Sequence, residues 1–338
     1  MNESDSSLEA RSTEAPVLDL PTLAVLCSVF NEEKAIPLFL ERLLPVFQSI
    51  EQYCQPRLYF IDNGSSDASL PLIREFHAQY PNIFVIVLSR NFGYECALET
   101  GLRIANEDLY VMIDVDCEDP PDMIHDFVLH WRTGYDIVYG ERSDRPETLL
   151  IKSARKIYYR LVRLLADDNF VLDMAEFSLI SREVRDAIIQ DATAYPFIRA
   201  SIGRIGFRRK NLIYKRQQRI AGQSHYNFLG MMIFAVGGIM SASTVVLRMS
   251  AYSFPFWAAI MIIIGIWAIA SPGNWQIATL LVVGQLFIGF TVTAAGLYIA
   301  RIYKDGLRRP NAIVRLALSI LPLNAQLPPP PVPFRRYE

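Results

Sequence analysis

The sequence predicts an α/β fold with a mainly parallel sheet, joined to a pair of membrane-spanning helices. Short apolar runs alternate with helical patterns between residues 23 and 139. Strands that are apolar on consecutive residues and separated by helices are typical of parallel sheets covered on both faces. Two long uncharged segments, 251–270 and 277–300, follow near the C-terminus. About 20 apolar residues suffice for a helix to cross a bilayer, so each segment is long enough.

Each expected element has its own pattern. Strands are expected at 23–30, 58–61, 83–88, 109–113 and 136–139, where the runs are apolar and β-rich. Helices are expected at 33–49, 70–80 and 94–105, with a fourth opening at Pro121 and Asp122. Ligands bind at the carboxyl ends of the strands in such sheets, so we expect the site there. No GxGxxG motif follows the first strand, which argues against a dinucleotide cofactor.

The composition divides the chain into five parts. We expect a disordered tail at 1–20, a globular domain at 21–227, an interfacial helical segment at 228–249, a transmembrane hairpin at 250–303 and a tail at 304–338. The first tail is rich in Ser and Glu and lacks the apolar run of a secretory signal. The stretch 228–247 is apolar but broken by glycines, so we expect it to lie on the membrane rather than cross it.

Charges around the hairpin predict its orientation. Arg248 precedes the hairpin and Arg301, Lys304, Arg308 and Arg309 follow it, whereas the loop at 271–276 carries no charge. Cytoplasmic loops carry an excess of Lys and Arg. We therefore expect an integral protein of a bacterial inner or plasma membrane, with the globular domain and both termini in the cytoplasm.

The net charge of −2 hides an uneven distribution. Acids concentrate before residue 150, and Lys and Arg crowd the stretch 152–219. We expect this basic half to face membrane lipid, and we expect no nucleic-acid partner. Within it, 151–165 has a basic amphipathic pattern, which suits a helix on a membrane surface or an ordinary surface helix. The cysteines at 27, 54, 96 and 117 show no metal-ligand pairing and are expected as reduced thiols.

The strongest candidate for chemistry is the run IDVDCEDPP at 113–121. An apolar strand leads into Asp114 and Asp116, which bracket one residue at the expected carboxyl edge. Two carboxylates spaced in this way can approach a hard cation and a pyrophosphate that it bridges, which is how Mg²⁺ or Mn²⁺ is commonly held. An acidic loop without a metal is the alternative.

Two further polar clusters follow neighbouring strands. The run DNGSSD at 62–67 follows the second strand, and VFNE at 29–32 ends the first. Alone, the first is ordinary turn and capping chemistry, and Asn31 and Glu32 are compatible with a simple helix start. Their expected location at one sheet edge favours a functional role for both clusters.

Together these motifs resemble a known family. VFNEE at 29–33, DNGSSD at 62–67, RNFGYECALETGL at 90–102, DVDCEDPP at 114–121 and YGERSDR at 139–145 are similar to GT-A-fold family 2 glycosyltransferases. They look most like the dolichol-phosphate mannosyltransferase and bacterial polyprenyl-phosphate glycosyltransferase branch. The resemblance continues through QRIAGQSHYN at 218–227 and GLYIARIYKDGLRRP at 296–310. It implies a GT-A domain and an enzyme that moves one sugar from a nucleotide sugar to a polyprenyl phosphate.

The resemblance implies roles for individual residues. Asp62 is expected to read the nucleotide base, with Asn31 and Glu32 lining the same pocket. The donor diphosphate and Mg²⁺ or Mn²⁺ are expected on Asp114 and Asp116, assisted by Glu118. The residues expected at the acceptor phosphate are Arg142, Arg199, Arg219 and Ser224, and those expected in catalysis are Asp116, Glu176, Arg142 and Arg219. As alternatives, Glu118 is a solvated acid, Arg142 a surface cation and Arg219 a lipid-facing cation.

The expected reaction follows from the acceptor. A lipid monophosphate has a second pKa of about 6, so it is mostly dianionic at neutral pH and needs alignment more than a base. In-line attack at the anomeric carbon would invert configuration, and arginines would hold the acceptor phosphate. A UDP-sugar is favoured over GDP-mannose as donor, with undecaprenyl or dolichyl phosphate as acceptor. Membrane lipids are further partners, and a second copy of the chain is left open.

Several positions depart from the family pattern. Asn63 stands where the family has a second acid, Ser28 where it has proline and His225 where it has lysine, and Ser178 replaces an arginine two residues after the acid Glu176. A changed donor sugar or a loss of function would account for these exchanges. The alternatives are therefore a catalytically inactive transferase fold that acts as a binding or assembly partner, or a polysaccharide synthase. The synthase would carry a QxxRW motif, but Gln217 and Gln218 lead to Arg219 without a tryptophan.

Overall fold

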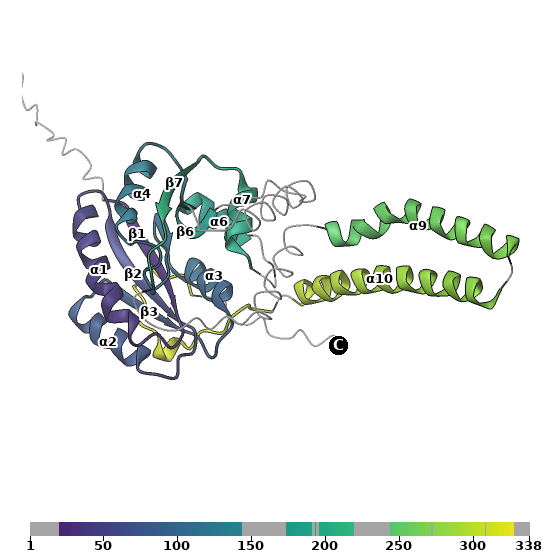
Figure 1. Ribbon diagram of the computed structural model, residues 1–338. Helices are drawn as coiled ribbons and strands as arrows, with labels where there is room; N and C mark the ends of the chain where they lie inside the picture. Colours follow the sequence, from purple (N-terminus) through teal and green to yellow (C-terminus); the bar gives the residue numbers. More distant parts are fainter. Residues whose placement is uncertain are drawn as a thin grey trace, which may run out of the picture.

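The computed structural model describes residues 20–143, 174–190, 193, 196–219, 244–271, 273–307 and 309–327. They form an α/β domain from which a pair of long helices projects (Figure 1). The expected tail at 1–19, the basic segment 151–165 and most of the expected interfacial segment, 228–243, lie outside the described residues.

One seven-stranded sheet with the order β3-β2-β1-β4-β6-β5-β7 organises the domain. The pairs β1–β2, β2–β3, β1–β4 and β5–β7 are parallel, and β6 runs antiparallel between β4 and β5. The predicted class, α/β with a mainly parallel sheet, is thus confirmed. The strand bounds are β1 Thr22–Val29, β2 Gln55–Asp62, β3 Ile83–Val87, β4 Leu109–Met112, β5 Ile137–Ser143, β6 Met174–Ser181 and β7 Arg209–Lys215.

The sequence analysis ended the strand series at residue 139 and missed β6 and β7. The missed strand β6 carries Glu176 and Ser178 on one side and buries Phe177 and Leu179 on the other, so it lacks the continuous apolar run used to find β1 and β3. The edge strand β7 is largely polar, with the sequence RKNLIYK. Strand β5 also extends to Ser143, which places Glu141 and Arg142 within the strand rather than after it.

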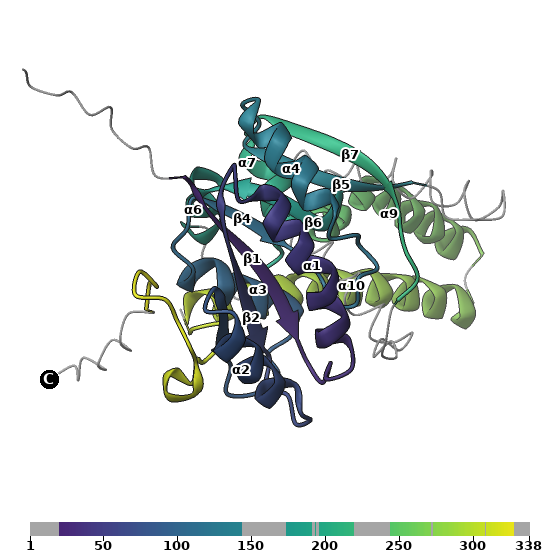
Figure 2. The same cartoon turned by 90° about the vertical axis from the view of Figure 1, so that its left-hand side faces the viewer.

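Helices cover both faces of the sheet (Figures 1 and 2). Alternate strand residues belong to two separate hydrophobic cores. Val25 and Cys27 lie in the first core, and Ala24 and Leu26 lie in the second. The first core is closed by α1 Ala35–Ile50, α2 Ser69–Gln79 and α4 Met123–Arg132. The second is closed by α3 Tyr94–Ile104, α6 Arg182–Gln190 and α7 Ile198–Ile205.

The two projecting helices form an antiparallel hairpin. They are α9 Val245–Ala270 and α10 Asn274–Gly306, and both are long and apolar enough to cross a membrane by length and composition. Trp257 of α9 stacks on Phe287 of α10 with ring centroids 4.6 Å apart. Both helices are longer than expected. The start of α9 lies within the segment expected to be interfacial, and α10 continues past residue 300.

The chain returns to the domain after α10. Residues 311–326, here called the C-terminal strap, run along strand β3, which is one edge of the sheet. Arg315 N donates to Val87 O at 2.7 Å, and Ile320 and Val85 exchange two backbone hydrogen bonds of 2.8 and 3.0 Å. An uncovered edge strand offers unpaired backbone groups to other chains, so the strap protects this edge. This part of the expected C-terminal tail therefore belongs to the domain.

Polar contacts extend the strap to the second core. Asn311 Nδ2 donates to Glu99 Oε2 of α3 at 2.6 Å and to Thr193 O at 2.8 Å. At the other end, Gln326 N donates to Ile104 O at 2.8 Å. The strap thus fixes the exit of α10 to helix α3 and to the sheet.

We expect Ile320→Asp to destabilise the domain, because the Ile320 side chain packs against the first core. Burying a charge against apolar neighbours should lower the free energy of unfolding by about 1–3 kcal/mol. The measurement is urea unfolding of the detergent-solubilised protein followed by circular dichroism. Leu323→Asp is the matched control, because Leu323 is fully exposed in the same strap. Equal effects of the two variants would contradict the assignment of the strap to the domain.

Candidate active site

Three polar loops meet at the carboxyl edge of the sheet. The ends of β1 and β2 are neighbours, with Val29 paired to Asp62, and β4 lies on the other side of β1. The pKa of the buried Cys27 thiol shows that charges from the first and third of these loops lie near one another. Burial raises the pKa of Cys27, and the nearby charges of Asp114, Asp116 and Glu32 raise it further. The predicted convergence of these loops at one edge is therefore present.

The first two loops are locked together by their own polar groups. Asn31 adopts a positive φ of 57°, and its Oδ1 accepts a hydrogen bond from Ser66 N at 2.8 Å. The backbone N of Glu32 donates to Ser69 Oγ at 2.9 Å. Asp62 is buried, and its Oδ1 accepts from Ser65 N at 3.0 Å. These contacts are the turn chemistry that the sequence allowed, and they also fix the two loops against each other.

The third loop carries the acidic pair. Asp114 is half-buried and accepts a hydrogen bond from the Tyr94 hydroxyl at the start of α3. Burial and then the charge of Asp116 raise the pKa of Asp114 to about 7, although the Tyr94 hydrogen bond acts in the opposite direction. Two carboxylates that resist joint ionisation are stabilised by a cation between them. The donor set at this position therefore fits a hard divalent cation.

Arginines already neutralise part of this loop. Arg219 Nη2 lies 2.9 Å from Asp116 Oδ2, and Arg219 Nε lies 3.5 Å from Glu118 Oε1. Arg216 pairs with Glu118 as well. Burial raises the pKa of Asp116, and Arg219 opposes that shift. Among the described residues no three acidic, His or Cys side chains gather as a metal cluster, and Glu118 faces these arginines.

A third arginine is fixed beside the loop. Arg142 of β5 donates from Nε to the Tyr214 hydroxyl at 3.0 Å and from Nη2 to the Asp119 carboxylate at 3.1 and 3.2 Å. The Tyr214 hydroxyl of β7 in turn donates to Asp119, which is 3% exposed. Burial opposes the charge of Arg142, but Asp119 and Tyr214 outweigh it and raise the pKa of Arg142. Neither Asp119 nor Tyr214 was singled out from the sequence, although Asp119 lies in the acidic run itself.

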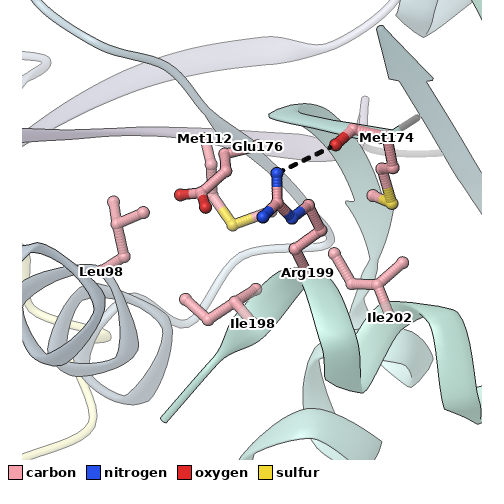
Figure 3. A pocket seen from close by; sticks show the side chains of 7 residues that line it. All are labelled: Leu98, Met112, Met174, Glu176, Ile198, Arg199 and Ile202. Carbon is pink, nitrogen blue, oxygen red and sulfur yellow. Dashed lines mark hydrogen bonds between the residues drawn. The ribbon is translucent and has the colours of Figure 1, made fainter. Parts of the chain in front are cut away.

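The remaining predicted acid, Glu176, lies on strand β6 rather than in one of the three loops. Glu176 of β6 and Arg199 of α7 line one small pocket together with Met112, Ile198 and Ile202 (Figure 3). Arg199 Nη1 donates to the backbone carbonyl oxygen of Met174 at 3.4 Å. Burial raises the pKa of Glu176, and Arg199 opposes the shift. The charge of Glu176 raises the pKa of Asp114, and the charge of Asp119 raises the pKa of Glu176, which indicates that Glu176 lies near the acidic loop.

Comparison with known proteins decides the family. The sequence pattern of glycosyl transferase family 2 matches residues 24–189. The chain is also 32% identical over 302 residues to the bactoprenol glucosyl transferase of Shigella phage SfV, covering 87% of this chain and 98% of that protein. It is 30% identical over 309 residues to a Bacillus subtilis protein named uncharacterized glycosyltransferase YkcC, covering 88% of this chain and 94% of that protein. The chain belongs to glycosyl transferase family 2.

Solved structures include distant likenesses to this glycosyltransferase. One is the mannosyltransferase PcManGT from Pyrobaculum calidifontis in complex with GDP-Man and Mn²⁺, at 16% identity, a TM-score of 0.40 and coverage of 85% and 88% of the two chains. Another is glucosyl-3-phosphoglycerate synthase from Mycobacterium tuberculosis in complex with UDP, at 18% identity, a TM-score of 0.45 and coverage of 64% and 79%. At these scores they carry no argument about the site, which stands on its own geometry.

Two departures from the family pattern have local explanations. Buried Asn63 accepts a hydrogen bond from Phe92 N at 2.9 Å and donates from Nδ2 to Asn91 Oδ1 at 3.2 Å. A carboxylate cannot make the second bond, so an amide suits this position. Ser178 is buried opposite Met112 and bonds to the backbone oxygen of Glu176, and the cation near Glu176 comes instead from α7.

The site also depends on a close approach that the motif DNGSSD does not reveal. Gly64 has a φ of 77°, and a Cβ at this position would lie 2.7 Å from the backbone carbonyl carbon of Arg90. Glycine therefore lets the loop of 62–67 pack against the loop of 90–93. Two other predicted site segments, Ser224 and the family-like run at 220–227, lie outside the described residues.

We expect Asp119→Asn to destabilise this glycosyltransferase by roughly 1–3 kcal/mol, because it leaves Arg142 beside a neutral amide in a partly buried position. The free energy of unfolding is measured by urea titration of the solubilised protein. The control is Asp126→Asn, since the Asp126 side chain is 61% exposed and its ion pair with His125 is long, at 3.8 Å. A loss no larger than that of the control would show that Asp119 does not anchor Arg142.

Proposed function

We propose that this glycosyltransferase moves one sugar from a nucleotide-sugar donor to a polyprenyl phosphate. The observation that carries the proposal is the acidic pair Asp114 and Asp116, set at the ligand-binding edge of the sheet and surrounded by guanidinium groups. Such a site suits a substrate with two phosphates beside an acceptor with one. The bactoprenol glucosyl transferase that matches this chain over nearly its full length supports the choice of a lipid acceptor. A UDP-sugar is favoured as donor, with GDP-mannose as the alternative.

The donor would lie across the three loops. Asp62 is proposed to contact the base, with Asn31 and Glu32 on the same wall. Asp114 and Asp116 fit a divalent cation, Mg²⁺ or Mn²⁺, which neutralises the donor diphosphate when it is bound. Glu118 is close enough in the chain to assist once its arginine partners are drawn to phosphate.

The acceptor would approach from the basic side. Its phosphate oxygen forms a bond to the anomeric carbon while the bond from that carbon to the donor diphosphate breaks, and the nucleoside diphosphate leaves with the electron pair. The dianionic phosphate needs no proton removal, so the chain supplies alignment and positive charge. Arg142, Arg199 and Arg219 are proposed to hold it, together with Ser224. Glu176 is proposed to orient the acceptor side of the site.

The strap supports a cytoplasmic location for both ends of the hairpin. Because residues 311–326 are hydrogen-bonded to the domain, the chain crosses any membrane an even number of times between residues 219 and 311. Two crossings, by α9 and α10, satisfy this condition and leave the segment before α9 on the domain's side. The cations Arg248, Arg301 and Lys304 near the open end of the hairpin favour the cytoplasm for that side.

We expect Asp116→Asn to reduce sugar transfer more than a hundredfold, because it removes one of two proposed cation ligands at the donor diphosphate. The assay incubates membranes with a panel of labelled nucleotide sugars and undecaprenyl phosphate. Binding of the donor to solubilised protein, with and without Mn²⁺, is measured in parallel, and Asp126→Asn serves as control. Full transfer by Asp116→Asn would refute the metal assignment. Absence of metal-dependent donor binding by the wild-type protein would favour the alternative of a catalytically inactive transferase fold.

We expect single cysteines at Leu323 and Ser271 to react from opposite sides of the membrane, since Leu323 lies in the strap and Ser271 at the far end of the hairpin. The background variant replaces Cys96, because Cys27, Cys54 and Cys117 are buried. Vesicles of both orientations are labelled with a membrane-impermeant maleimide. Reaction of both cysteines from one side would exclude two crossings.

A further inference from the structure

The buried acid Glu95 of helix α3 has no part in the donor, metal or acceptor roles proposed above. Glu95 lies in the first turn of α3, next to Tyr94, and its side chain is buried. Its Oε2 accepts a hydrogen bond from Ile198 N at 3.1 Å, at the start of α7. Its carboxyl group also shares a hydrogen bond with the carboxyl group of Glu176 on β6. Glu95 therefore joins three elements of the second core beneath the site.

The contact between the two acids needs a proton. Two ionised carboxylates offer only acceptors and repel each other. The second oxygen of Glu95, Oε1, is buried and meets no hydrogen-bond donor among the described residues. The two carboxyl groups can face each other only if one of them donates, so the pair holds a shared proton.

The surroundings decide which acid keeps this proton. The charged and titratable groups that face the pair are Arg199 from α7 and Tyr94 from α3, with Asp114, Asp119 and Arg142 acting from the site side. Burial and then the charge of Glu176 raise the pKa of Glu95 well above its usual range. On Glu176 the rise caused by burial is opposed first by Arg199. These directions favour Glu95 as the protonated member of the pair and Glu176 as the anion.

We propose that Glu95 is a positioning residue that donates a hydrogen bond to the Glu176 carboxylate while accepting one from Ile198 N, and so fixes the position of the Glu176 side chain. The proposal rests on the function proposed above insofar as Glu176 serves the acceptor. Two adjacent residues in the first turn of α3 then donate hydrogen bonds to two different acids. Tyr94 donates to Asp114, and Glu95 donates to Glu176. A shift of the start of α3 would disturb both acids together.

This arrangement makes glutamine a faithful substitute for Glu95. A glutamine amide offers one donor to Glu176 and one acceptor to Ile198 N, as the protonated acid does. Alanine offers neither, and it would leave Glu176 with Arg199 alone. We expect Glu95→Gln to keep sugar transfer within about threefold of the wild type near neutral pH. We expect Glu95→Ala to lower kcat at least tenfold, with a smaller change in KM for the donor.

A pH series supplies a measurement that does not require transfer. Because the pKa of Glu95 is raised in the folded state, its contribution to stability is present at low pH and is lost as pH rises through that raised pKa. Glu95→Gln carries no such proton. The unfolding midpoint of the wild type should therefore fall relative to that of Glu95→Gln as pH rises from the ordinary range of a glutamate pKa through the raised pKa of Glu95. Glu99→Gln is the matched control, since buried Glu99 lies four residues further along α3 and pairs with Arg103 and Asn311 instead. Its unfolding midpoint should follow the wild-type pH dependence.

The outcomes separate the two proposals. If the wild type transfers no sugar from any donor but Glu95→Gln still removes the loss of stability with rising pH, the proposed function fails and the shared proton stands. Glu95→Gln as impaired as Glu95→Ala, or a pH dependence of unfolding unchanged by Glu95→Gln, would overturn the positioning role. Recovery of transfer by glutamine but not by alanine, with the altered pH dependence, would support it.

Discussion

The compensation of buried negative charge is the constraint on which the site depends. Acids accumulate where the loops after β1, β2 and β4 meet β6, and isolated charges in such a place are costly. Each acid has an identified partner. Tyr94 binds Asp114, Arg219 binds Asp116 and Glu118, Arg142 and Tyr214 bind Asp119, and Arg199 with Glu95 offsets Glu176. Without these partners, keeping the buried carboxylates charged would cost more free energy.

The same constraint explains the uneven charge distribution along the chain. The acids come mainly from the first half, where each strand of the parallel sheet ends in a polar loop. The cations come from β5, α7 and the segment after β7, so they reach the acids only when the later part of the chain has packed. The basic half therefore does more than face lipid. Arg216 and Arg219 contact the acidic loop directly, so part of that basic region belongs to the site.

Sequence patterns predicted most of the first half of the fold, because there each element carries a local signal. Continuous apolar runs mark β1 and β3, and the loops after β1, β2 and β4 follow from the ends of those runs. The edge location of Asn31, Asp62 and Asp114 could thus be predicted before any coordinates. Contacts such as Asp119 with Tyr214 join residues 95 positions apart and have no local pattern. The strap was missed for the same reason, since its pairing with β3 depends on where α10 ends.

Asn63 and Ser178 show that the effect of a departure from a family pattern is difficult to judge from the amino-acid sequence alone. From the sequence, a changed donor sugar and a partial loss of function were both open as explanations. Asn63 instead makes a donor and an acceptor bond to the loop of 90–93, which an aspartate could make only in part. Ser178 lies in the middle of β6 between β4 and β5, where an arginine would be buried without access to solvent. Arg199 from α7 lies near Glu176 instead, so the charge balance of the site is kept although its source along the chain has changed.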